Sequence, residues 1–362
     1  MQTRPALAQL TPYEPGRPAA AVRRDLGLER VVKLASNEGL YGPLPAAREA
    51  LAAAIGELNR YPEAGGELVE RLAARHRVAT SQIGLGNGAD SIIGLLAMAY
   101  LDPGDEAVMP TPSFPSYRLS ALRMGARPVE VELAADGSHD LDTMLARIGP
   151  RTRLVYVCNP NNPTGGLVDR ERLARFVEAV PGDVLVACDE AYHDYVLDPR
   201  YPDAAAEHAA HRPNVCALRT FSKIHGLAGL RIGYMVGPAD VVRAVAAVRN
   251  AFDVSELAHV AALASLDDPA ELRRRRDENA LLRPALAEAI EALGLPVRES
   301  HANFVCVDTG DAAALAGRLL HEGVIVRPLA GFGAPGSVRV TVGTPEQNDA
   351  FLAALGRCLQ PA

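Results

Sequence analysis

One lysine lies in a segment whose residue types could make its amine a nucleophile. Lys223 follows the apolar run 214–218 and is surrounded by small, apolar and glycine residues, and Arg231 comes eight positions later. A lysine that is poorly solvated and close to other cations loses affinity for its proton, so its neutral amine can form a Schiff base with a carbonyl compound. Taken alone, such a segment is more often a surface lysine in a glycine-rich loop, so its interpretation depends on the neighbouring strands.

Two other apolar runs end in polar residues of complementary chemistry. Run 153–158 enters a loop whose prolines fix φ and whose glycines permit positive φ, so the amide of Asn162 can be held rigidly toward a ligand oxygen. Run 184–188 is followed by Asp189, with Tyr192 three residues later, and this carboxylate could also be a helix cap or an ion-pair partner. Ligands of open α/β sheets bind at the carboxyl ends of the strands. Three strands that end in asparagine, aspartate and lysine therefore predict one shared ligand site.

Together these segments resemble those of the fold-type I aminotransferases that use pyridoxal 5'-phosphate (PLP), and within them the histidinol-phosphate aminotransferase branch. The resemblance covers nearly the whole chain and is also carried by the stretches 10–18, 32–38, 59–62 and 338–343. The loop that contains Asn162 and the segment of Lys223 are its most specific parts. The N-terminal stretches point to the branch.

The resemblance assigns the PLP ring to residues at the three strand ends. Lys223 supplies the amine that binds the cofactor and is the catalytic residue. Asp189 lies beside the pyridine nitrogen and keeps it protonated, so that the ring can act as an electron sink. Asn162 and Tyr192 match the pair that contacts the phenolic oxygen. Phe114 matches the aromatic residue that covers the ring face, although a phenylalanine could equally belong to the core there.

The resemblance also implies which residues bind the phosphate of the cofactor. Gly88, Ala89 and Asp90 precede an apolar run that reads as a helix, and the N–H groups at a helix start bind anions. Ser222 and Arg231 match the remaining phosphate contacts of the family.

Further residues are implied to bind the substrate or the partner subunit. Tyr61 matches a residue that reaches the cofactor of the partner, which implies a homodimer. Guanidinium groups suit both carboxylates and phosphates. The substrate-binding residues implied by the resemblance are Tyr13, Asn37, Arg327 and Arg339.

The expected activity is a transamination in two half-reactions, with a small-molecule amino donor first and a 2-oxo acid second. The branch favours L-histidinol phosphate and 2-oxoglutarate, which give imidazole acetol phosphate and glutamate. The sequence departs from the branch after Glu38, where Gly39 and Leu40 replace the usual Asn-Pro, and the stretch 42–45 resembles aromatic amino-acid aminotransferases. Transamination of phenylalanine or tyrosine is therefore an alternative, as is decarboxylation of a phosphorylated amino acid. A non-catalytic PLP-binding regulator is a third class, for which no segment is left over to form a DNA-binding domain.

The order of the apolar runs predicts an α/β fold, in which a mostly parallel sheet flanked by helices forms a large PLP-binding domain and a smaller α+β domain follows. We expect an arm at 1–30, where prolines oppose helix formation, the large domain at 31–268 and the small domain at 269–362, opening with one long helix. The expected strands are 107–110, 128–133, 154–158, 184–188, 215–218, 232–236, 304–307, 325–327 and 338–342.

The composition argues against several classes of partner. The chain of 362 residues has a net charge of −7 and no apolar stretch of membrane-spanning length, so neither nucleic acid nor a membrane is expected as a partner. Residues 1–10 lack the apolar core of a signal peptide, and five scattered cysteines suggest a reducing cytoplasm. His208 and His211 lack a metal-ligand pattern, so no metal is expected. The arginine run 273–276 is interpreted as a solvated, ion-paired helix face.

Overall fold

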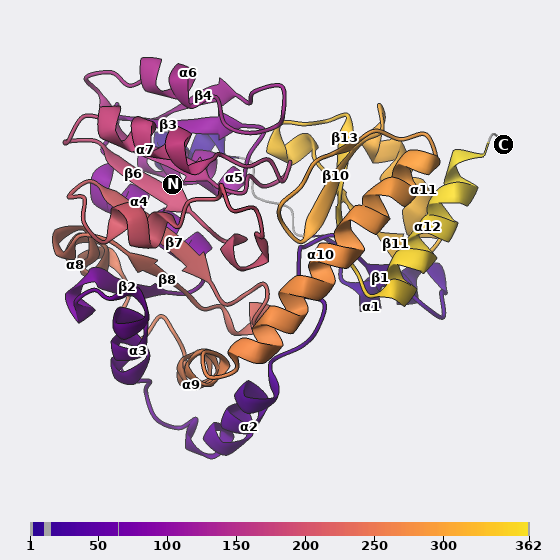
Figure 1. Cartoon of the computed structure of the whole chain (residues 1–362), viewed down its shortest axis with the longest axis horizontal. Coiled ribbons are helices and arrows are strands. Elements are labelled where there is room, and N and C mark those ends of the chain that lie inside the picture. Colours follow the sequence, from indigo (N-terminus) through magenta and orange to yellow (C-terminus); the bar gives the residue numbers. More distant parts are fainter. Residues whose placement is uncertain (1–2, 11–15, 64, 361–362) are drawn as a thin grey trace.

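Two layered units joined by one long helix make up the computed structural model, which describes residues 3–10, 16–63 and 65–360 (Figure 1). The larger unit contains a seven-stranded sheet in the order β2-β8-β7-β6-β5-β3-β4. Strands β4, β3, β5, β6 and β7 are parallel, whereas β8 runs antiparallel to both β7 and β2. The mostly parallel sheet predicted from the sequence is confirmed. Its strands are β2 (Ile83–Gly86), β3 (Glu106–Thr111), β4 (Arg127–Glu132), β5 (Thr152–Cys158), β6 (Leu185–Asp189), β7 (Val215–Thr220) and β8 (Gly233–Val236).

Helices cover both faces of this sheet, so its central strands are apolar on both sides. In β5, Val155 and Val157 belong to one core cluster and Leu154 and Tyr156 to the other, as expected for side chains that alternate across a strand. The first cluster includes residues of α2 (Pro45–Ala54), α3 (Gly66–His76), α6 (Leu141–Ala146), α7 (Arg170–Ala179) and α9 (Glu256–Ser265). The second includes residues of α4 (Ala89–Tyr100), α5 (Pro115–Met124) and α8 (Ala239–Val248).

The smaller unit contains a four-stranded antiparallel sheet in the order β12-β13-β10-β9, covered by helices (Figure 1). Its strands are β9 (Val297–Arg298), β10 (Phe304–Asp308), β12 (Arg327–Pro328) and β13 (Ser337–Thr341). Its helices are α10 (Pro269–Ala292), which extends from the larger unit, α11 (Ala312–His321) and α12 (Pro345–Leu359). The division at residues 31 and 269 stays a prediction, and β1 (Val32–Lys33) pairs in parallel with β11 (Val324–Ile325).

Two expectations about secondary structure are wrong. The expected strand 325–327 is divided into β11 and β12, which belong to different sheets. The arm contains the helix α1 (Ala19–Leu26) directly after Pro18, because proline is tolerated at a helix start, where its missing N–H leaves no hydrogen bond unmade. Val22 of α1 is fully buried against Ala35 and Ile325, so apolar packing holds this short helix.

The arginine run on α10 is not a uniformly solvated face. Arg274 is half exposed and pairs with Glu271 and Glu278, as expected. Arg275 is buried: its Nη1 donates to the carbonyl oxygens of Gly42 at 2.9 Å and Ile224 at 3.0 Å. Four consecutive helical residues point in directions about 100° apart, so at least one of them must face the core. Arg275 thereby connects α10 to the loop that carries Lys223.

Candidate active site

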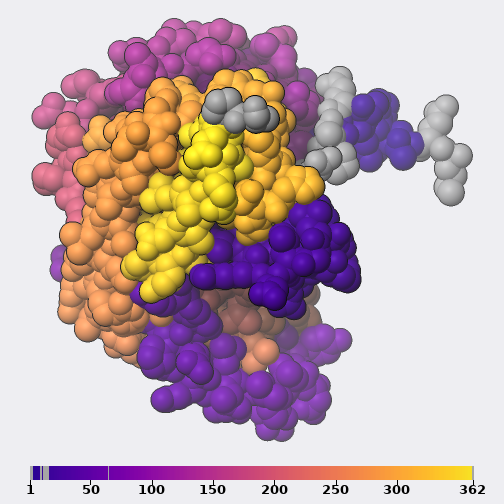
Figure 2. All heavy atoms as spheres, turned by 90° about the vertical axis from the view of Figure 1, so that its right-hand side faces the viewer, coloured from indigo at the N-terminus to yellow at the C-terminus, as the bar shows by residue number. Residues whose placement is uncertain are grey.

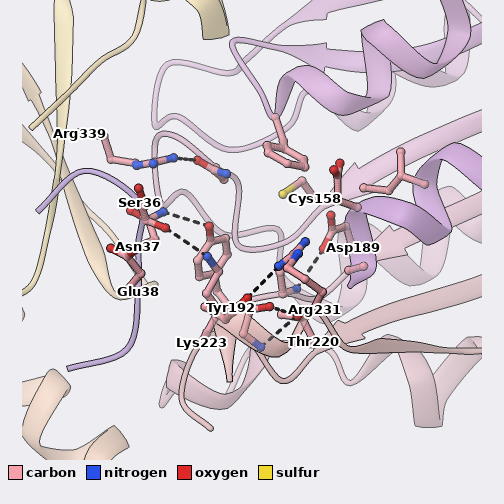
Figure 3. A pocket seen from close by; sticks show the side chains of 18 of the residues that line it. Ser36, Asn37, Glu38, Cys158, Asp189, Tyr192, Thr220, Lys223, Arg231 and Arg339 are labelled. Carbon is pink, nitrogen blue, oxygen red and sulfur yellow. Dashed lines mark hydrogen bonds between the residues drawn. The ribbon is translucent and has the colours of Figure 1, made fainter. Parts of the chain in front are cut away.

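A cavity of about 270 Å³ lies at the carboxyl ends of β5, β6 and β7, where the sheet meets residues 36–38 and the small-unit strand β13 (Figure 3). These strands are parallel and adjacent, so the polar residues at their ends share one edge. The structure places most of the residues singled out in the sequence around this cavity. They are Asn37, Ala89, Asp90, Phe114, Asn162, Asp189, Tyr192, Ser222, Lys223, Arg231 and Arg339.

Lys223 lies in the loop between β7 and β8, and its amine points into the cavity. The Nζ atom donates a hydrogen bond to the carbonyl of Ser36 at 3.4 Å and lies 5.6 Å from the ring centre of Tyr192. Burial, together with the positive charges of Arg339 and Arg231, lowers the pKa of Lys223 to about 7. A substantial fraction of the amine is therefore neutral near pH 7 and can act as a nucleophile.

The segment 36–39 packs directly against the backbone of this lysine. Gly39 is required here because a Cβ atom at this position would collide with the carbonyl oxygen of Lys223. Asn303 fixes the segment from the other side, since its amide donates to the carbonyls of Asn37 and Glu38, each at 3.2 Å. The departure from the branch at Gly39 thus lies in contact with the predicted catalytic residue.

Asp189 ends β6 and is 4% exposed. Its Oδ1 accepts the backbone N–H of Ala191 at 3.0 Å, and its Oδ2 accepts the hydroxyl of Tyr117 at 2.6 Å. Burial raises the pKa of Asp189, and these two hydrogen bonds act in the opposite direction because they stabilise the carboxylate. The site therefore holds a desolvated carboxylate that has donors on both oxygens.

Arg339 is buried among aromatic rings and polar acceptors at the small-unit side of the cavity. Its guanidinium carbon lies 5.4 Å from the ring centre of Phe304 and 5.2 Å from that of Phe332. It donates to Asn162 Oδ1 and, at 2.9 Å, to the carbonyl of Ala35. A desolvated guanidinium that faces a cavity can bind a carboxylate or a phosphate strongly.

The hydroxyl of Tyr192 accepts a hydrogen bond from Asn37 Nδ2 at 3.0 Å, and Asn37 has a φ of +52°. Because the Tyr192 oxygen accepts this bond, its own proton remains available to a ligand oxygen. Burial raises the pKa of Tyr192, so the hydroxyl stays protonated and acts as a donor.

The opposite end of the cavity forms an anion cradle. Gly88 precedes α4 with a φ of +80°, and a Cβ atom there would lie 2.7 Å from Nη2 of Arg231. Arg231 itself has a φ of +57°. The first N–H groups of α4, the Ser222 hydroxyl and this guanidinium converge where a phosphate would be stabilised by hydrogen bonds and by the helix dipole. The lysine, the buried carboxylate and this cradle fit the aldehyde, the ring nitrogen and the phosphate of PLP.

The family model for aminotransferase class I and II matches residues 29–355. The chain belongs to the class I and II aminotransferases. The histidinol-phosphate aminotransferase of Moorella thermoacetica is 45% identical over 98% of this chain and 92% of its own length. Histidinol-phosphate aminotransferase 2 of Pseudomonas aeruginosa is 44% identical over 98% of this chain and 97% of its own length. The crystal structure of the histidinol-phosphate aminotransferase from Sinorhizobium meliloti, in complex with pyridoxal-5'-phosphate, has a TM-score of 0.88 at 29% identity and covers 99% of this chain and 97% of that one. The predicted fold class and the predicted PLP-dependent transaminase are confirmed.

Three predicted site residues that the structure describes do not line the cavity of this aminotransferase. Gly88 lies just behind it, against Arg231. Arg327 is paired in register with Arg339 but lines a neighbouring cavity of about 620 Å³, which shares Phe114 and Phe332 with the first. Tyr61 is 80% exposed and stacks on Phe252, with the ring centres 4.6 Å apart. Tyr13 lies outside the described residues.

Other residues of the aminotransferase belong to the site but were missed in the sequence. Thr220 and Cys158 line the cavity at the ends of β7 and β5, and Phe332 closes it from the small unit. Tyr117 reaches Asp189 from α5 and follows Phe114 by three residues, a spacing that places both on one face of a helix. That spacing is the signal that could have revealed Tyr117.

His225, whose role the sequence left open, does not line the cavity. Its Nδ1 lies 2.9 Å from the hydroxyl of Ser265, and its ring contacts Phe221. Burial lowers the pKa of His225 to about 4, so the ring is neutral and contributes to packing. Within residues 3–10, 16–63 and 65–360, no cluster of three or more His, Cys, Asp or Glu side chains could hold a metal ion. None of the helices in those ranges is both long and apolar enough to cross a membrane.

Proposed function

We propose that this aminotransferase transfers the amino group of L-histidinol phosphate to 2-oxoglutarate with PLP as its cofactor. The observation that carries the chemistry is that Lys223, Asp189 and Arg339 face one cavity next to an anion cradle. Relatives that are 44–45% identical over nearly the whole chain are histidinol-phosphate aminotransferases, which supports the substrate.

Each residue has a defined task in this proposal. PLP, when bound, supplies an aldehyde that takes up the amino group and a ring that accepts electrons from the substrate's Cα. Lys223 holds the cofactor at rest and then moves the proton from the substrate's Cα. Asp189 keeps the ring nitrogen protonated. Asn162 and Tyr192 orient the ring through its phenolic oxygen, and Phe114 covers the ring face.

Arg339 binds the anionic group of both substrates in turn, because both half-reactions use the same cavity. Arg339 is buried next to the rings of Phe304 and Phe332, and a desolvated guanidinium attracts an anion more strongly than one in water. Histidinol phosphate presents a phosphate and 2-oxoglutarate a carboxylate, and a planar guanidinium can accept either in a bidentate arrangement. Arg327 is paired with Arg339 on the neighbouring strand and lines the adjoining cavity, from which it adds positive charge near the bound anion.

A donor panel tests the substrate assignment. L-histidinol phosphate, phenylalanine and tyrosine are each supplied with 2-oxoglutarate, and glutamate and CO2 are both measured. We expect the highest kcat/KM for histidinol phosphate, with glutamate as a product and no CO2. Higher values for phenylalanine or tyrosine would establish the aromatic alternative, toward which the Gly39–Leu40 departure points. Release of CO2 without glutamate would establish a decarboxylase.

Arg339→Ala is expected to raise KM for both the amino donor and 2-oxoglutarate. Removing one partner of a desolvated ion pair costs about 2–5 kcal/mol, which corresponds to at least about a 30-fold change. Arg339→Lys should recover little, because a point charge does not replace a planar fork. Steady-state kinetics with each substrate varied in turn provide the measurement. An unchanged KM for both substrates would show that the anion is held elsewhere, with Arg327→Ala as the next variant.

We further propose that the enzyme is a cytoplasmic homodimer whose active sites are shared. Tyr61 and Phe252 are both exposed and stacked on one another, which fits residues that are covered by a partner. Mixing inactive Lys223→Ala with Tyr61→Phe should produce hybrid dimers whose activity differs from the mean of the two parents. A fully active monomer in sedimentation would refute the shared site.

A further inference from the structure

The hydroxyl of Tyr117 is buried against the carboxylate of Asp189. We propose that Tyr117 is a positioning residue, which keeps Asp189 ionised and aims its remaining lone pairs into the cavity. This inference rests on the proposed use of PLP, because Asp189 acts only when the ring nitrogen is present. Tyr117 is thus a hydrogen-bond partner for the carboxylate that comes from α5, the helix capped by Phe114.

The contact has the geometry of a charge-assisted hydrogen bond. The Tyr117 hydroxyl lies 2.6 Å from Asp189 Oδ2, and the tyrosine is 1% exposed. On the other oxygen, Oδ1, the backbone N–H of Ala191 donates at 3.0 Å. Two donors from the protein therefore fix the plane of the carboxylate and leave acceptor capacity for a third donor in the cavity.

The first turn of α5 places this hydroxyl. Phe114 caps the helix and Pro115 begins it, so Phe114 and Tyr117 lie on the same face. Their rings meet edge to face with centres 5.8 Å apart, and Tyr117 also stacks on Tyr156 at 4.6 Å. One helical turn thus supplies both the residue that would cover the PLP ring and the donor to the carboxylate beneath it.

The electrostatic surroundings explain why a donor is needed. Burial disfavours the charged form of Asp189, and so do the neighbouring negative charges, whereas the positive charge of Lys223 favours it. Burial also raises the pKa of Tyr117 well above its ordinary value, so this hydroxyl remains a donor. Asp189 interacts electrostatically with titratable groups of every element packed around it. These groups are Asp90 of α4, Tyr117 of α5, Cys158 of β5, Cys188 of β6, Glu190 and Tyr192 just after β6, and Lys223 after β7.

Removal of the Tyr117 hydroxyl has a definite sign. A hydrogen bond to the ionised form lowers a carboxyl pKa, so its loss raises the pKa of Asp189 and the carboxyl stays protonated to higher pH. A protonated Asp189 cannot pair with a protonated ring nitrogen. The affinity for PLP should therefore begin to fall at a higher pH when the solution is acidified.

The experiment titrates PLP into the apo-enzyme over a series of pH values and follows absorbance. For Tyr117→Phe we expect the Kd for PLP at neutral pH to rise about tenfold, the effect of losing one hydrogen bond to a charged group. The acid limb of the affinity profile should also move upward in pH. Tyr156→Phe is the matched control: Tyr156 is also fully buried and stacked, but its hydroxyl donates to the carbonyl of Ile93 at 3.3 Å. In Tyr156→Phe the affinity for PLP should fall at the same acidic pH as in the wild type.

A double-mutant cycle separates positioning from packing. In an Asp189→Asn background, Tyr117→Phe should alter the Kd for PLP by less than about threefold, because the charge that the hydroxyl serves is absent. Equal effects in both backgrounds, or equal shifts from Tyr117→Phe and Tyr156→Phe, would overturn the proposal.

Two further measurements test the proposal if Tyr117→Phe does not fold or if the substrate assignment fails. If Tyr117→Phe did not fold, carbon-13 NMR of labelled aspartate in the wild-type apo-protein would decide, with Asp189 assigned from Asp189→Asn. An Asp189 found protonated at neutral pH would contradict the proposal. Amino transfer from histidinol phosphate is measured separately, so a failed substrate assignment leaves the PLP affinities interpretable.

Discussion

Lys223→Ala protein is expected to bind PLP without a covalent bond and to lose almost all turnover. The variant loses both the amine that holds the cofactor and the base that moves the proton. The second loss alone accounts for a decrease of about 10²–10⁴-fold, the usual contribution of one positioned proton-transfer group. Single-turnover kinetics with histidinol phosphate provide the measurement, and PLP binding followed by absorbance verifies the fold.

The chain contains only two lysines, Lys33 and Lys223, so the covalent attachment can be identified without ambiguity. Borohydride reduction of the PLP-loaded enzyme should add the cofactor to Lys223. Lys33, whose Nζ is ion-paired with Glu38 at 2.6 Å, should remain unmodified, and Lys33→Ala provides the matched control. Attachment to Lys33, or to neither lysine, would contradict the assignment.

The pH dependence of PLP capture is a further consequence for Lys223. Because its pKa is lowered to about 7, the neutral amine predominates above that pH. The rate of capture should rise with pH up to this region and then level off. A rate that kept rising toward the ordinary lysine pKa of about 10 would show that the amine is not desolvated.

Asp189→Asn is expected to lower turnover at least about 100-fold, the scale on which one preorganised electrostatic partner acts. The amide keeps the shape of the side chain but removes the charge that holds the ring nitrogen protonated. PLP occupancy should fall much less than turnover. Glu38→Gln, which removes a carboxylate elsewhere on the cavity wall, should lose far less activity. Near-wild-type turnover in Asp189→Asn would refute the role.

Sequence reasoning was most successful where one local pattern determines both structure and position. The apolar runs that lead to Asn162, Asp189 and Lys223 are buried parallel strands, and parallel strands bring their ends to one edge. A short apolar run with polar residues at its end therefore predicted the strand and much of the cavity wall. Gly88 could be predicted for a related reason, since a helix start after a glycine-rich turn attracts anions, whereas Arg231 was assigned by the family resemblance alone.

The features that were missed depend on contacts between distant elements. Tyr117 reaches Asp189 because α5 packs against the end of β6, and Phe332 lines the cavity because the small unit packs there. The burial of Arg275 depends on where α10 crosses the Lys223 loop, which the run of four arginines does not reveal. The location of Arg327 next to a second cavity depends on the break between β11 and β12.

The antiparallel direction of β8 has a mechanical consequence. Because β7 and β8 run in opposite directions, the loop that carries Lys223 and Arg231 leaves and re-enters the sheet at one edge, closed by the pair Thr220 and Gly233. The spacing between the amine of Lys223 and the guanidinium of Arg231, which is assigned to the cofactor phosphate, is thus set within a single closed loop of the larger unit. Arg339 stands on a strand of the other unit. With the roles proposed above for Arg339, Lys223 and Arg231, a hinge motion between the two units would release the substrate's anion and leave the spacing of the two cofactor-binding side chains unchanged. A transaminase must release its first product before it admits the second substrate. Such a motion would let the two exchange while the cofactor, with the amino group that it carries, stays bound.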